Sequence, residues 1–193
     1  MSLRRISINA SLIAFSVVLG TLVIIPIPGA FGVVTAADIG ILAGALILGP
    51  FEGALIGAVS GALIDVFTGY LQWMPFSLTI HAAEGFVAGL IGVLAVRKLD
   101  TVKEEEVSAE IIEMSADKDM QGKVRGNRIN WLFTILALSA GLLVMVAGYF
   151  LVTWWIYGIG AAVISIPANI GQSALGAVGA VIILRVSTRF REI

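Results

Sequence analysis

The sequence places one histidine and a few acidic residues inside long apolar stretches, where ionisable groups are costly and mark candidate functional sites. Ser77, His81 and Glu84 follow one another at spacings of four and three, so they share one face of a helix. Such a face can accept a proton, pair with a cationic ligand or supply metal ligands; a simple internal hydrogen bond between His81 and Glu84 is the structural alternative. One histidine and one glutamate are fewer ligands than a metal site requires. Neither a metal site nor a cofactor is therefore predicted.

Two further acids lie at the ends of apolar stretches. Asp38 follows a segment rich in glycine and proline, and it either stabilises a helix N-terminus electrostatically or contacts a ligand beneath that segment. Asp65 continues the spacing of Gly53, Gly57 and Gly61, which recur every four residues and predict a smooth face for close helix packing. Asp65 itself either pairs locally or lines a pocket.

The last third of the chain adds amides and aromatic rings. Asn169 and Gln172 share a helix face, and buried amides need hydrogen-bond partners, either on other helices or on a small heterocycle. Tyr149, Trp154 and Trp155 close the preceding apolar stretch, where they form an interfacial belt or stack on a ring. The candidate ligand contacts are Asp38, His81, Glu84, Tyr149, Trp154, Trp155, Asn169 and Gln172. No catalytic residue is assigned.

Composition indicates that these side chains are positioned by membrane-spanning helices. Hydrophobic residues make up 59% of the 193 residues and charged residues 13%, against about 25% charged residues in soluble domains. A helix needs about 20 residues to cross the hydrocarbon layer, and each charge at its centre costs roughly 2.5–3.5 kcal/mol. Charge-poor stretches therefore predict an all-α membrane protein with six transmembrane helices. The predicted spans are 6–25, 35–49, 53–71, 75–96, 129–153 and 168–184, with prolines, including Pro167, at their boundaries.

The basic residues set the predicted orientation. All twelve lie at the N-terminus, between spans four and five, or at the C-terminus, and the opposite loops (26–34, 69–74 and 154–167) contain none. By the positive-inside rule both termini are cytoplasmic. Residues 98–128 then form a charged cytoplasmic loop, either a solvated and partly helical linker or a docking segment.

Several classes of function are disfavoured. The chain has no cysteine, which excludes a disulfide framework and thiolate metal sites. Its formal net charge of −1 gives no basic excess for binding nucleic acid. It also lacks the glycine-rich phosphate loop of an ATPase.

Four segments, in this order, resemble the S components of energy-coupling factor (ECF) vitamin transporters. They are 10–14 in span one, 44–57 across spans two and three, 81–85 in span four, and 167–172 at the start of span six. The resemblance is closest to the branch for hydroxymethylpyrimidine and pyridoxine, within a wider class that includes thiamine and riboflavin.

The resemblance implies a multi-pass protein of the prokaryotic cell membrane that binds a small vitamin near the outer side. It also implies that Ala10 and Ala14 dock on a transmembrane T component coupled to two ATPases. Two alternatives remain from the residues alone: a small intramembrane enzyme using His81 and Glu84, and a structural membrane partner without a ligand.

Overall fold

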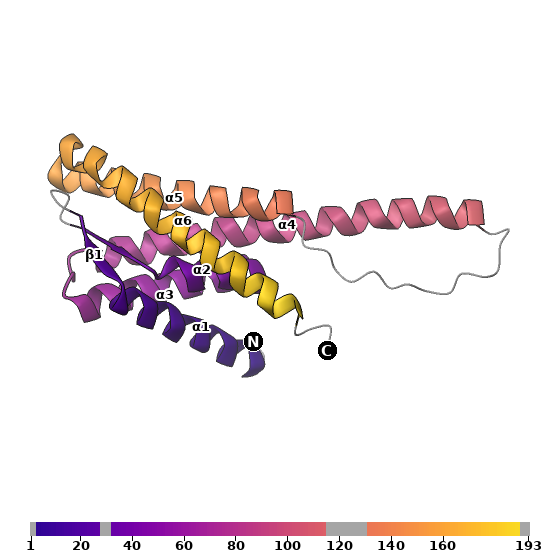
Figure 1. Cartoon of the computed structure of the whole chain (residues 1–193), viewed down its shortest axis with the longest axis horizontal. Coiled ribbons are helices and arrows are strands. Elements are labelled where there is room, and N and C mark those ends of the chain that lie inside the picture. The colour runs from indigo at the N-terminus through magenta and orange to yellow at the C-terminus, as the bar shows by residue number, and fades with distance from the viewer. Residues whose placement is uncertain (1–2, 28–31, 115–130, 190–193) are drawn as a thin grey trace.

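A computed structural model describes residues 3–27, 32–114 and 131–189, and the side chains within them except for 95–114 and 188–189. The described part contains a bundle of helices and one small hairpin (Figure 1). The helices are α1 (Leu3–Leu22), α2 (Asp38–Leu48), α3 (Pro50–Thr68), α4 (Met74–Met114), α5 (Trp131–Tyr157) and α6 (Ile159–Arg189), and the strands are β1 (Ile24–Pro26) and β2 (Val33–Thr35).

The short helix α2 lies at the centre of the bundle and contacts α1, α3, α4 and α6. The start of α1 and the end of α6 lie at one end of the bundle, here called the terminal end (Figure 1). The hairpin and the α3–α4 and α5–α6 turns lie at the other end, here called the hairpin end. Helix α4 continues beyond the bundle at the terminal end.

The predicted glycine face packs α3 against α4. A Cβ at Gly57 would overlap the backbone carbonyl of His81, and one at Gly61 would lie 2.8 Å from the His81 ring. A Cβ at Gly53 would lie 2.6 Å from the carbonyl oxygen of Gly85. Only glycine leaves room for the two backbones at this spacing, so these residues fix how close His81 comes to α3.

The hairpin occupies part of the loop predicted over 26–34 and shortens the second predicted span. Ile24 pairs with Thr35 and Pro26 with Val33 in an antiparallel ladder. Helix α2 consequently begins at Asp38 rather than at residue 35. The reason is that residues 33–35 satisfy their backbone groups by pairing with β1 instead of continuing a helix.

The prediction of an outer loop over 154–167 is wrong. Helix α5 continues to Tyr157, Gly158 reverses the chain with φ 86°, and α6 starts at Ile159, nine residues before the predicted span. Pro167 lies inside α6 rather than at its boundary. Proline is tolerated within membrane helices because nearby hydroxyls and neighbouring helices can satisfy the freed backbone groups.

The structure supports an all-α membrane protein. By length and composition, five of the described helices are able to cross a membrane, and the apolar helix α2 is shorter, with 11 residues. Helix α4 runs through 98–114 of the predicted charged loop, and the rest of that loop lies outside the described residues.

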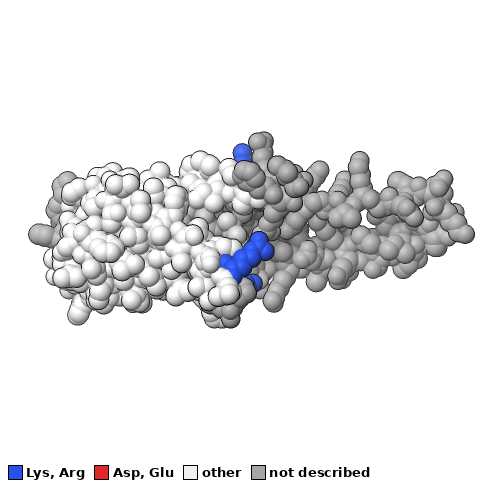
Figure 2. Space-filling model, turned by 90° about the horizontal axis from the view of Figure 1, so that it is seen from below, with Lys and Arg blue, Asp and Glu red and all other residues white. Residues whose placement is uncertain are grey.

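Charged side chains are distributed unevenly along the bundle. On the face seen in Figure 2 the Lys and Arg side chains lie toward the terminal end, while the hairpin end is white. At the terminal end the Arg5 guanidinium pairs with the Glu52 carboxylate at 2.9 Å. On this face the described residues of the hairpin end therefore present no charged side chain.

Candidate functional site

A cavity lies at the hairpin end of the bundle. The hairpin, the α3–α4 turn, α4, α5 and α6 all contribute to its wall. The polar and aromatic lining includes Asp65, Tyr70, Trp73, Ser77, Tyr149 and Asn169. A few polar groups placed among aromatic side chains are typical of the lining of small-ligand sites.

One wall of the cavity is aromatic. Trp73 is 5% exposed, and its ring centroid lies 6.0 Å from those of both Tyr149 and Tyr157. The backbone N–H groups of Phe76 and Ser77 bond to the Trp73 carbonyl oxygen, so the tryptophan is held at the start of α4. Rigid aromatic faces of this kind supply stacking area for a planar ring.

Polar groups run from this wall into the protein. The Tyr149 hydroxyl donates to Ser77 Oγ at 2.9 Å and lies 3.1 Å from His81 Nε2. Asp65 lines the same space, and its Oδ2 is buried without a hydrogen-bond partner in the described part of the chain. A ligand that donates hydrogen bonds would therefore meet acceptors here.

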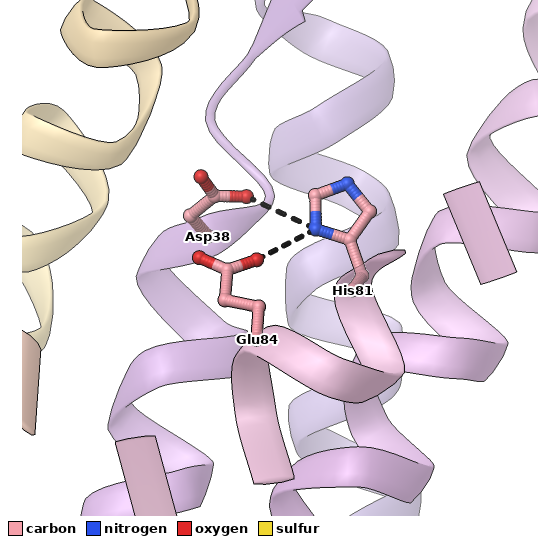
Figure 3. A group of neighbouring side chains, drawn as sticks. All are labelled: Asp38, His81 and Glu84. Atoms are coloured by element: carbon pink, nitrogen blue, oxygen red, sulfur yellow. Dashed lines mark hydrogen bonds and ion pairs between the residues drawn. The ribbon is translucent and has the colours of Figure 1, made fainter. Parts of the chain in front are cut away.

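Beneath the cavity, three ionisable side chains converge. Asp38 comes from the first turn of α2, and His81 and Glu84 come from α4 (Figure 3). His81 Nδ1 lies 2.8 Å from Glu84 Oε2 and 3.6 Å from Asp38 Oδ1. All three residues are buried, and the predicted sharing of one helix face by Ser77, His81 and Glu84 is confirmed.

Gln172 connects this cluster to the hairpin. Its Oε1 accepts the backbone N–H of Thr35 at 2.8 Å, and its Nε2 donates to Asp38 Oδ1 at 3.2 Å. Ser173 adds a longer contact to Asp38 Oδ2 at 3.5 Å. Asp38 makes no side-chain cap of its own helix. The bonds to α6 direct its carboxylate toward His81 instead.

The structure separates the predicted site residues into two groups. Asp38, His81, Glu84, Tyr149, Asn169 and Gln172 line the cavity or the cluster beneath it. Trp154 and Trp155 are 51% and 78% exposed and pack against Phe150 and Phe76 on the outside.

Sequence reasoning did not assign Trp73 or Tyr70 to the site. Both belong to a short turn that the hydropathy pattern treated only as a connection. Two aromatic residues in so short a turn were the available signal.

Comparisons with known proteins identify the family. The model of the ECF-type riboflavin transporter S component matches residues 1–114. The chain is also 31% identical over 176 residues to the thiamine precursor transporter HmpT of Lactococcus lactis subsp. cremoris, with 91% of this chain and 82% of the relative covered. The chain belongs to the S components of ECF transporters. An uncharacterised protein of Pyrococcus woesei is 31% identical over 155 residues, covering 80% of this chain and 82% of that protein.

As an S component, this protein is the membrane-embedded substrate-capture subunit of an ECF vitamin transporter. S components capture small molecules and act with a T component and ATPases. The resemblance stated from four sequence segments is confirmed.

Proposed function

We propose that the S component captures a hydroxymethylpyrimidine-type precursor of thiamine in the cavity at the hairpin end. The observation that carries this proposal is the composition of the cavity, in which acceptor groups of Asp65 and Ser77 lie beside the Trp73 and Tyr149 rings. The relative HmpT is named a thiamine precursor transporter, which agrees with a small nitrogen heterocycle. Asn169 and Gln172 would add amide contacts, and His81 would bound the inner side.

Charge favours a neutral or cationic ligand over an anionic one. No Lys or Arg occurs between Arg5 and Arg97, or between Arg128 and Arg185. Asp38, Asp65 and Glu84 lie within the first of these intervals. A phosphate or carboxylate in this cavity would face carboxylates with no cationic side chain to compensate, and like charges destabilise binding. An aminopyrimidine instead offers donors to the carboxylates and a planar face to Trp73.

A thermal-shift and calorimetry panel on the purified protein tests the proposal. The panel compares hydroxymethylpyrimidine, its phosphate ester, pyridoxine, thiamine and riboflavin. The pyrimidine should raise the melting temperature and its phosphate ester should not. A panel in which no compound shifts the melting temperature would refute ligand capture, and preference for the ester would refute the charge argument.

A matched pair of tryptophans localises the site. Trp73→Leu should weaken pyrimidine binding about tenfold, because stacking on an aromatic residue contributes roughly 1–3 kcal/mol and 1.4 kcal/mol is tenfold. Trp155→Leu, on the outer surface, should change affinity less than about twofold. Equal effects of the two substitutions would place the ligand elsewhere.

The proposal also includes topology and membrane. The protein has six spans with both termini and residues 98–128 in the cytoplasm of a prokaryotic cell, and the hairpin end faces outward. The sidedness of the basic residues supports this orientation. Because the chain has no cysteine, single cysteines introduced at Leu71 and Lys103 report sidedness directly. An impermeant thiol reagent added to intact cells should label Leu71→Cys and spare Lys103→Cys, and the reverse pattern would overturn the topology.

Under this proposal the protein binds its ligand without converting it chemically. The helix-one alanines, Ala10 and Ala14, are both exposed on α1, where they offer a flat patch to the T component and, through it, to two ATPases. An intramembrane enzyme would instead convert the pyrimidine. Incubation of the bound ligand with purified protein, followed by mass spectrometry, should recover it unchanged, and a product lost in His81→Asn would favour the enzyme.

A further inference from the structure

The three ionisable side chains beneath the cavity have the arrangement of a metal-binding group. Asp38, His81 and Glu84 each present one ligand atom, and these atoms lie within 4.8 Å of one another. Sequence spacing brings together only the two residues of α4, and the fold adds Asp38 from α2. Figure 3 shows both contacts converging on His81 Nδ1.

A second observation is the unpaired oxygen of Glu84. The residue has no exposed surface, and its Oε1 has no hydrogen-bond partner among the residues that the structure describes. Figure 3 shows the Glu84 carboxylate beneath that of Asp38. Two buried carboxylates share one imidazole, and the chain supplies no Lys or Arg between Arg5 and Arg97. A buried carboxylate oxygen left without a donor is costly, and a cation between the groups would satisfy it.

The hydrogen bonds on the far side of the imidazole favour a free lone pair at Nδ1. Tyr149 has one hydroxyl proton, which it donates to Ser77 Oγ. His81 Nε2–H can then donate to the Tyr149 oxygen at 3.1 Å, and Nδ1 faces the carboxylates. A ligating histidine is commonly oriented by such a bond from its other ring nitrogen.

We propose that Asp38, His81 and Glu84 hold a divalent transition-metal ion of the Zn²⁺ or Co²⁺ type beneath the ligand cavity. One imidazole and two carboxylates suit such ions. In tetrahedral coordination, metal–ligand bonds of about 2.0–2.2 Å set ligand pairs roughly 3.3–3.6 Å apart. The two distances from His81 Nδ1, 2.8 and 3.6 Å, bracket that range.

The ion would neutralise the cluster and brace the junction of α2 and α4. A double positive charge balances the carboxylates of Asp38 and Glu84, so Asp65 remains the charged group facing the captured ligand. His81 also lines a smaller space next to the main cavity, which provides room for water on the ion. This inference does not depend on which vitamin is captured.

Metal titration of the whole purified protein tests the site. After treatment with a chelator and its removal, the protein should bind one Co²⁺ per chain saturably and develop visible d–d absorption bands. Zn²⁺ should displace the Co²⁺ and bleach these bands. At about 100 times the dissociation constant the ion should raise the melting temperature by roughly 5–10 °C. Absence of saturable binding of either ion to the wild-type protein would overturn the proposal.

Variants distinguish this site from adventitious binding. His81→Gln and Glu84→Gln should each lose the Co²⁺ bands and weaken binding at least about tenfold. Glu52→Gln is the matched control, because it also removes one acid but lies near the terminal end. This variant should retain the Co²⁺ bands and the wild-type affinity for the ion. Bands that persist in His81→Gln would refute coordination by the imidazole.

The ligand panel, repeated on metal-free wild-type protein, separates the two proposals. Metal binding without any pyrimidine response would contradict only the proposed function. A pyrimidine response without metal binding would contradict only the metal site.

Discussion

Gln172→Leu tests whether one amide joins the hairpin to the buried cluster. The substitution keeps a side chain of similar size but removes the acceptor for the Thr35 N–H and the donor to Asp38. Leaving a buried N–H unsatisfied costs about 1–3 kcal/mol, and a hydrogen bond to a charged group contributes about 1.5–3 kcal/mol. Allowing for the added apolar burial of leucine, the expected loss of unfolding free energy is about 3 kcal/mol.

Thermal unfolding of the purified protein measures this loss. In a chain of this size each kcal/mol corresponds to about 2–4 °C, so Gln172→Leu should lower the melting temperature by about 6–12 °C. The matched control is Asn169→Leu, because Asn169 is also a buried amide of α6 but bonds more weakly, with its Nδ2 3.5 Å from Ser165 Oγ. Its loss should be about 1 kcal/mol or less. Equal melting temperatures for the two variants would refute the bridging role of Gln172.

Two further predictions concern helix packing within the protein and docking on its partner. Gly57→Ala should lower the unfolding free energy by about 1–3 kcal/mol, because its Cβ would overlap the His81 carbonyl. Gly171→Ala is the control in the same thermal assay, and it should be neutral or slightly stabilising because no atom lies close to its Cβ. Replacing Ala10 and Ala14 with leucine should abolish co-purification with the T component and leave pyrimidine affinity unchanged. The exposed Ala147 of α5 gives the control substitution for this pull-down, and retention of the T component by the α1 variant would contradict the docking surface.

The predicted helix ends differ from the observed ones because hydropathy locates apolar stretches and does not report backbone hydrogen bonding. For this reason the pairing of Thr35 within the hairpin and the continuation of the helix through Pro167 were not predicted. For the same reason, Trp155 and Trp73 could not be ranked from sequence. Both are aromatic residues at span ends, and only packing places one on the surface and the other on the cavity wall.

The sequence alone determined that this protein is a helical membrane protein, because the cost of burying charge shapes the composition of every span. The family was indicated separately, by the resemblance of four segments to S components. The sequence also determined that Ser77, His81 and Glu84 share a helix face, because helical spacing is local. Only the tertiary structure decided that Asp38 joins His81 and Glu84, since glycine-mediated packing of α3 on α4 and the Gln172 bridge from α6 act between residues far apart in the chain.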